Sequence, residues 1–155
     1  MSSQAKYDLL FVDYDDEIRK RAVQYFQGHG YEVTAAAGGA EALQLSKGRA
    51  FHVAVLDMAM PQMSGIDLLE KLRQSNPETE VVMLTGHGTI ETAVQAMKLG
   101  AHDFLTKPVR FPHLAAVIEK AAEAGQLRKE NRQLRAVIER SQTTGGMIGD
   151  SPAMR

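Results

Sequence analysis

Five short apolar runs alternate with stretches of helical periodicity, and this alternation constrains the fold more than any other feature of the chain. Strands that are apolar along their whole length are typical of parallel sheets covered by helices on both faces. The sequence therefore predicts an α/β fold, a doubly wound five-stranded parallel sheet over about residues 6–122. The predicted strands are Leu9–Val12, Tyr31–Ala35, His52–Leu56, Val81–Leu84 and Phe104–Leu105.

The stretches between these runs carry apolar residues at helical spacing, as in the segment from Glu17 to Phe26. Gly28 and Gly30 are expected to end that helix, and Gly100 is expected to cap the helix before the fifth strand. The chain thus reads as a fivefold strand–helix repeat.

The composition changes after this repeat, where residues 121–141 are polar and favour a helix that should break at Thr143–Gly146. Apolar and amide residues recur there in alternating steps of three and four, the spacing of a coiled-coil seam. A parallel partner helix would pair Glu123 with Arg128 and Glu130 with Arg135. We expect a helical linker at 123–142 that forms a homodimer through 123–140; a solvated terminal helix with a chance pattern is the alternative. The seam residues are Ala124, Leu127, Asn131, Leu134 and Ile138.

Charge and composition exclude several classes of function. The formal net charge is −1 without a basic stripe, so neither nucleic acid nor an anionic membrane is an expected partner of these residues. Cysteine is absent, which excludes a thiol nucleophile and a thiolate metal site. No apolar run approaches the roughly 20 residues that cross a bilayer, and the N-terminus lacks a signal-peptide pattern. We expect a cytoplasmic protein.

Polar residues follow four of the predicted strands: Asp13, Asp57, Thr85 and Lys107. Ligands of doubly wound sheets bind beyond the carboxyl ends of the strands. A lysine there needs a counter-charge, which two aspartates on neighbouring strands can supply. Each residue also has a plain structural explanation, such as a helix-terminal acid, a loop carboxylate or a turn residue. Their joint occurrence favours a site. The five histidines lack the spacing of metal ligands.

This set of groups fits phosphoryl transfer onto a carboxylate. An aspartate can act as a nucleophile and form an aspartyl-phosphate. The transferred group needs Mg²⁺, a lysine and hydroxyl or N–H donors around it. We expect Asp57 to be the acceptor, Asp13 to help hold Mg²⁺, and Thr85 and Lys107 to contact the phosphoryl oxygens.

Several motifs together resemble the receiver domain of two-component response regulators. They are Phe11–Asp13 followed by acids, Leu56–Gly65, Leu84–Gly88 and Lys107–Pro108. The run TIETAVQAMKLGAHDFLTKP resembles the nitrogen-regulator subfamily, which activates sigma-54-dependent transcription. The resemblance implies a flavodoxin-like receiver fold at 1–122 and phosphorylation of Asp57 by a sensor histidine kinase. Residues 143–155 look like the start of a truncated ATPase domain, so sigma-54 RNA polymerase and DNA would be reached only through further domains.

The resemblance also assigns finer roles. Ala59 matches the position whose backbone carbonyl ligates the metal, and Phe104 matches the aromatic switch that reorients when Thr85 moves toward the phosphoryl group. Such a domain is a phospho-acceptor, able at most to dephosphorylate itself, and is not expected to be an enzyme.

Tyr14 departs from the family pattern, because a second metal-binding acid normally follows the first. A neutral phenol does not replace a carboxylate as a ligand of a hard cation. The favoured explanation is a weakened but present Mg²⁺ site; in the alternatives, Asp15 compensates as a weak candidate ligand or the domain signals without phosphate. Tyr14 could equally be a natural or an engineered variant.

Two further classes of function compete with this reading. A pseudo-receiver would serve as a phosphorylation-independent dimerisation or docking module, marked by Tyr14. A phosphatase that works through an aspartyl-phosphate would need a general acid where Ala59 stands, which disfavours it. A flavin-binding domain is disfavoured by the absence of tryptophan.

Overall fold

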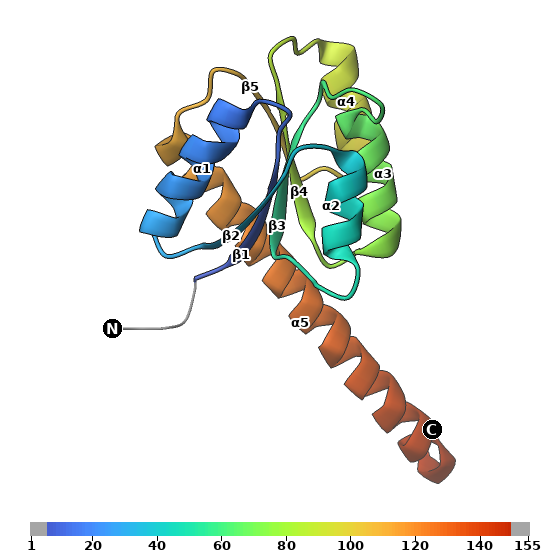
Figure 1. The fold of residues 1–155 in the computed structure, drawn as a ribbon. Helices are drawn as coiled ribbons and strands as arrows, with labels where there is room; N and C mark the ends of the chain where they lie inside the picture. The colour runs from blue at the N-terminus through green and yellow to red at the C-terminus, as the bar shows by residue number, and fades with distance from the viewer. Residues whose placement is uncertain (1–5, 150–155) are drawn as a thin grey trace. The chain divides into compact units, whose positions relative to one another are not determined.

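A computed structural model describes residues 6–149, with side chains over 6–138, and contains a five-stranded parallel sheet (Figure 1). The strand order is β2-β1-β3-β4-β5, in which β1 pairs with β2 on one side and with β3 on the other. This order confirms the predicted doubly wound sheet. The strands are β1 (Asp8–Val12), β2 (Glu32–Ala36), β3 (Val53–Asp57), β4 (Glu80–Thr85) and β5 (Asp103–Thr106).

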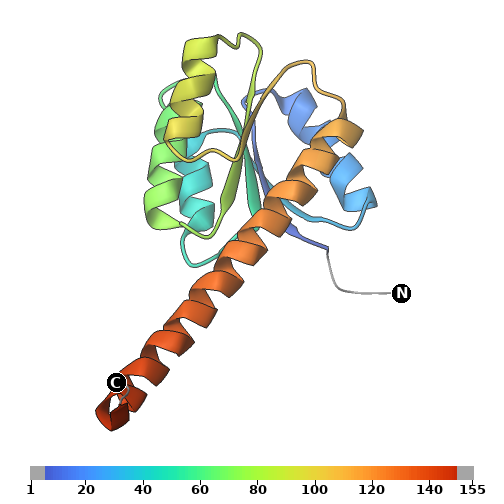
Figure 2. The same ribbon diagram turned by 180° about the vertical axis from the view of Figure 1, so that it is seen from behind.

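Helices cover both faces of the sheet, as Figures 1 and 2 show. The helices are α1 (Asp16–Gly28), α2 (Gly39–Ser46), α3 (Gly65–Ser75), α4 (Ile90–Lys98) and α5 (Phe111–Gly149). Leu9, Phe11, Val53 and Val55 pack with α1 and the first part of α5 on one face. The intervening strand residues pack with α2, α3 and α4 on the other. Side chains of a strand alternate between faces, so strands that are apolar throughout build two cores at once.

The helix ends follow local capping chemistry. Asp15 accepts from the backbone N–H groups of Glu17 and Ile18 and so caps α1, and Ser64 caps α3 through the N–H of Asp67. Thr89 and Thr92 form a capping box at the start of α4. Gly100 has a φ of 106° just after α4, the left-handed conformation that favours glycine at a helix end.

Helix α5 extends further than predicted, and α4 exposes several apolar side chains. Helix α5 does not break at Thr143 but continues through Gly145 and Gly146 to Gly149, because glycine lowers helix propensity by about 1 kcal/mol without forbidding an added hydrogen bond. The apolar residues Ile90, Val94 and Met97 of α4 are exposed, whereas Ala96 is buried. The larger apolar side chains of α4 therefore lie at the surface.

The chain divides into two compact units, one that ends at Gly125 and one that begins at Gln126. The sequence predicts the boundary between the receiver and its helical linker between residues 122 and 123. The second unit is helical over its described residues, to Gly149. Among the described helices, none is long and apolar enough to cross a membrane.

Candidate functional site

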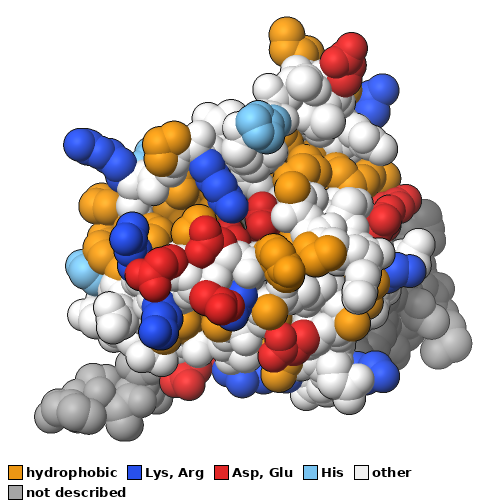
Figure 3. Space-filling view, turned by 45° about the horizontal axis from the view of Figure 1, so that its top comes forward, with side chains coloured by type: hydrophobic (Ala, Val, Ile, Leu, Met, Phe, Trp, Pro, Cys, Tyr) orange, Lys and Arg blue, Asp and Glu red, His pale blue; other side chains and the backbone are white. Residues whose placement is uncertain are grey.

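The carboxyl ends of four strands bring Asp13, Asp57, Thr85 and Lys107 to one edge of the sheet. Val12 pairs with Leu56, so Asp13 and Asp57 leave neighbouring strands at the same level. Asp57 and Thr85 are the last residues of β3 and β4, and Lys107 directly follows β5. On the face that Figure 3 presents, with the top of Figure 1 turned forward, acidic side chains gather near the middle with Lys and Arg among them.

The Lys107 ammonium group bridges two buried carboxylates. Its Nζ donates to Oδ2 of Asp13 at 2.9 Å and to Oδ1 of Asp57 at 3.2 Å. Asp13 is fully buried and Asp57 is 5% exposed. Burial of a charge is costly unless it is paired and hydrogen-bonded. One cation here serves two carboxylates, so the site carries an excess of negative charge.

Backbone N–H groups complete the surroundings of the two carboxylates. Asp15 N donates to Oδ1 of Asp13 at 2.9 Å. Asp57 receives longer bonds, from Tyr14 N to Oδ2 at 3.5 Å and from Ala59 N to Oδ1 at 3.4 Å. Because Oδ1 also accepts from Lys107, Oδ2 is the less strongly engaged oxygen of Asp57.

The electrostatics of the site favour uptake of positive charge. Burial, and then the Asp13 carboxylate, raise the pKa of Asp57, while Lys107 opposes this shift. Burial lowers the pKa of Lys107, but its bond to Asp13 and the charge of both carboxylates raise this pKa overall. Lys107 therefore stays protonated, whereas the charged form of Asp57 is disfavoured by its surroundings. A further cation beside Asp57 would stabilise its charged form.

Thr85 and Phe104 lie on neighbouring strands and meet through the loop that follows β4. The Thr85 side chain is buried, and its Oγ1 accepts from the N–H of His87 at 3.1 Å. A Cβ placed on Gly88 would lie 3.0 Å from the Phe104 ring and 3.3 Å from the Thr85 methyl group. The absence of a side chain at Gly88 thus lets this loop close over both residues.

Gly65 ends the Leu56–Gly65 motif, but the sequence reasoning assigned it no role in the site. A Cβ at this position would lie 2.4 Å from the backbone oxygen of Asp57 and 2.8 Å from the Cα of Met58. Gly65 N also donates to the carbonyl of Met58 at 2.9 Å. The start of α3 therefore presses directly against the backbone of Asp57. A glycine directly after a helix N-cap, eight residues beyond the acceptor candidate, is a weak signal for this contact.

The acidic candidates for metal ligation differ in what they contact. Tyr14 is 60% exposed, and the Asp15 carboxylate is engaged in capping α1. Among the described residues, no group of three or more His, Asp or Glu side chains is placed to hold a metal ion. Asp13 and Asp57 are the carboxylates that lie together.

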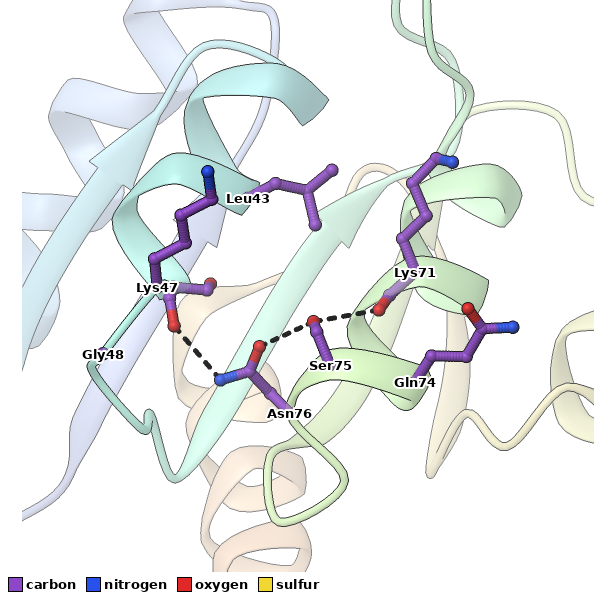
Figure 4. A pocket seen from close by; sticks show the side chains of 8 residues that line it. Leu43, Lys47, Gly48, Lys71, Gln74, Ser75 and Asn76 are labelled. Carbon is purple, nitrogen blue, oxygen red and sulfur yellow. Dashed lines mark hydrogen bonds between the residues drawn. The ribbon is translucent and has the colours of Figure 1, made fainter.

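A separate hollow of about 590 Å³ lies between the C-terminal turns of α2 and α3 (Figure 4). In the wall of this hollow, the Asn76 side chain donates to the carbonyl of Ser46 at 3.2 Å and accepts from the Ser75 hydroxyl at 2.8 Å. The residues that line it include Lys47 and Lys71 but no carboxylate. Because α2 and α3 run back from the carboxyl ends of the strands, this hollow lies at the opposite edge of the sheet from Asp57.

Comparison with known proteins gives a consistent result. The family model described as the response regulator receiver domain matches residues 9–119. The regulatory protein AtoC of Escherichia coli is 32% identical over 146 residues, which are 94% of this chain and 32% of AtoC. The chain thus spans about a third of the length of the curated relatives it matches.

Solved structures agree with the predicted fold. NtrX from Brucella abortus superposes with a TM-score of 0.77 and 36% identity, over 83% of this chain and 30% of NtrX. A receiver domain protein from Clostridium thermocellum superposes with a TM-score of 0.73 and 32% identity, over 77% of this chain and 97% of that one.

Proposed function

Since this chain belongs to the response regulator receiver domain family, we propose that it receives a phosphoryl group from a sensor histidine kinase on Asp57. The observation that carries the proposal is the Lys107 bridge, which places one ammonium group between Asp57 and Asp13. A buried aspartate whose pKa is raised, beside a fixed cation, is a typical arrangement of functional sites.

The geometry supports Oδ2 of Asp57 as the attacking atom, because Oδ1 is held by Lys107 and by the N–H of Ala59. In the transfer, an O–P bond to Oδ2 forms as the P–N bond of a phosphohistidine breaks, and the departing imidazole keeps the bonding electron pair. The new phosphoryl oxygens would then lie within reach of Lys107 and of the N–H of Tyr14. Fixed donors of this kind stabilise the charge on the transferred group without reorganisation.

The donor set of the site fits Mg²⁺, which prefers oxygen ligands. Two buried carboxylates share one cation here, so an additional divalent cation would offset the remaining negative charge. Asp13, Asp57 and the backbone carbonyl of Ala59 would hold it. When bound, Mg²⁺ supplies charge neutralisation for the phosphoryl oxygens. Because Tyr14 provides no carboxylate, we propose a metal site that is present but weaker than one with two acids in this loop, with Asp15 retained for the cap of α1.

The signal would pass from Thr85 to Phe104. A hydroxyl drawn toward the phosphoryl group would leave its contact with the N–H of His87 and disturb the packing of Gly88 over the Phe104 ring. Signalling would then be a population shift between two arrangements of the loop before α4. The same contacts argue against a pseudo-receiver that ignores phosphate, since the acceptor, the lysine and the hydroxyl are all in place.

The output of the whole protein is also a proposal. The relatives are about three times as long as this chain, and the residues from 143 onward resemble the start of an ATPase domain, although 150–155 lie outside the described residues. We propose that the receiver controls an attached ATPase that acts on sigma-54 RNA polymerase and, through a further domain, on DNA.

Helix α5 supports a homodimer. Leu127, Leu134 and Ile138 are 65%, 60% and 51% exposed, and they lie at the seam positions that the sequence predicts. An exposed apolar stripe on a helix with a heptad pattern is the usual contact surface of a parallel coiled coil. We propose that residues 123–140 pair with a second copy of the chain, and that Asn131 fixes the register.

The test is intact-mass spectrometry after incubation with acetyl phosphate and Mg²⁺. We expect one phosphoryl adduct on the parent chain, none on Asp57→Asn, and an undiminished adduct on Asp67→Asn, a control at an exposed aspartate of α3. Tyr14→Asp should lower the Mg²⁺ concentration that half-saturates the reaction. An adduct that persists on Asp57→Asn would contradict the proposed acceptor. A parent and a Tyr14→Asp variant that both stay unmodified would contradict the function itself.

A further inference from the structure

Arg19 holds the loop that carries Asp13 and Tyr14 in place by hydrogen bonds to its backbone. Its Nη1 donates to the carbonyl oxygen of Asp13 at 2.7 Å and to that of Tyr14 at 3.2 Å. Its Nη2 is paired with the carboxylate of Asp16 on the same helix. The Arg19 side chain is only 20% exposed, although it reaches the surface carboxylate of Asp16, which is 84% exposed. A planar guanidinium can hold several oxygens at fixed angles in this way, which an ammonium group cannot.

The other polar groups of this loop are engaged as well. Oδ1 of Asp15 accepts from the N–H groups of Glu17 and Ile18. The N–H of Asp15 donates to Oδ1 of Asp13 at 2.9 Å. The backbone carbonyls of residues 13 and 14 face Arg19, and the Tyr14 side chain is mostly exposed. The Asp13 carboxylate is thus the acidic group of the loop that is directed at Lys107 and Asp57.

We propose that Arg19 is a positioning residue for the divalent cation: it fixes the carbonyls of residues 13 and 14, so that the loop presents the Asp13 carboxylate as its single protein ligand. This inference rests on the proposed metal-assisted function and explains how one carboxylate can serve there without a second acid at Tyr14. It also means that Asp15 does not compensate for Tyr14, because its carboxylate holds the start of α1.

Two opposite effects of Arg19 can be separated by experiment. A guanidinium near the site repels a divalent cation, so the loss of its charge alone would strengthen Mg²⁺ binding. The loss of positioning would weaken binding, because groups that orient a metal ligand typically contribute about 10-fold or more to affinity. Arg19→Lys keeps the charge but cannot hold both carbonyls and Asp16 together, whereas Arg19→Ala removes both properties.

The experiment is calorimetric titration of the whole chain with Mg²⁺ in the absence of any phosphodonor. We expect Arg19→Lys to bind about 10-fold more weakly than the parent, Arg19→Ala to bind more weakly than the parent but no more weakly than Arg19→Lys, and Asp13→Asn to lose binding. Lys20→Ala, which removes the neighbouring exposed cation of α1, should bind like the parent. Asp15→Asn should also bind like the parent, since asparagine caps a helix as well as aspartate does.

Other outcomes would overturn the inference. If Arg19→Ala binds Mg²⁺ as well as or better than the parent and Arg19→Lys binds it like the parent, Arg19 acts only through its charge. A loss of binding in Asp15→Asn as large as that in Asp13→Asn would show a second ligand in the loop. A parent chain that binds no Mg²⁺ would refute the positioning role as well. Melting temperatures of all variants, measured without Mg²⁺, identify any that are misfolded. Because no phosphodonor is present, a failure of Asp57 phosphorylation leaves these results unchanged.

Discussion

The Nζ atom of Lys107 lies 2.9 Å from Oδ2 of Asp13, and this bond links the end of β5 to the end of β1 across the two strands between them. The two residues are 94 positions apart in the chain. The same ammonium group holds Asp57 at 3.2 Å. Much of the behaviour of the site should follow from this shared cation.

Removal of the Lys107 charge should destabilise the domain. Lys107→Met keeps most of the side-chain volume but leaves two buried carboxylates without their cation. Because the Lys107 side chain is 23% exposed, we expect a loss of roughly 2 kcal/mol in the free energy of unfolding at pH 7, below the full cost of breaking a buried pair. Urea unfolding measures this. Asp57→Asn should change the stability differently in the Lys107→Met background and in the parent, and an equal change in both backgrounds would argue against the bridge.

Asp57→Asn should make the domain more stable at neutral pH. Because burial and Asp13 raise the pKa of Asp57 above its unfolded value, the folded state prefers the protonated carboxyl. Its unfavourable contribution is absent below the ordinary aspartate pKa, grows as the pH rises above that value, and is complete above the raised folded pKa. We expect a gain in the free energy of unfolding at pH 7 and none near pH 3. Thermal unfolding across this pH range measures the gain, and a gain that is independent of pH would contradict the assignment to charge.

Gly65→Ala should disturb both stability and phosphorylation. The added Cβ would meet the backbone of Asp57 and Met58, which cannot move aside as a flexible side chain would. We expect a loss of about 2–3 kcal/mol and a lower rate of adduct formation with acetyl phosphate. Gly28→Ala is the matched control, since nothing lies within 4 Å of its Cβ position. If Gly65→Ala proves as stable as Gly28→Ala, the close approach of α3 to Asp57 is wrong.

The loop after Asp57 contains a non-glycine residue with positive φ, Gln62 at 74°. Left-handed backbone is unfavourable for a residue with a Cβ and worst for a branched one. Gln62 is exposed, so its side chain contributes little packing. We expect Gln62→Val to lower the free energy of unfolding by about 1 kcal/mol and Gln62→Gly not to lower it. Chemical denaturation measures the order of stability of the two variants. This order would be reversed if the backbone at Gln62 were extended.

A charge introduced at the α5 seam should dissociate the proposed dimer. Leu134→Asp places a carboxylate at a core position of both helices, where it would face its own copy. We expect the parent chain to sediment as a dimer and Leu134→Asp as a monomer in analytical ultracentrifugation. Gln133→Asp, next to it but off the seam, should stay dimeric. Equal masses for parent and Leu134→Asp would reject the coiled coil.

The sequence by itself determined the fold class. Apolar runs and helical spacing are local properties, and strands buried on both faces leave a parallel sheet as the main solution. The residues that end those strands were identifiable for the same reason, since the carboxyl ends of parallel strands share one edge. Asp13, Asp57, Thr85 and Lys107 could thus be named without coordinates.

Only the tertiary structure decided which atoms meet at that edge. That Lys107 bridges Asp13 and Asp57, that Gly65 presses on the Asp57 backbone, and that Arg19 holds the carbonyls before α1 all depend on close approaches. The capping role of Asp15, too, required the start of α1 to be fixed. Such contacts depend on packing between segments far apart in the chain or on the exact path of a loop, and neither periodicity nor composition encodes them.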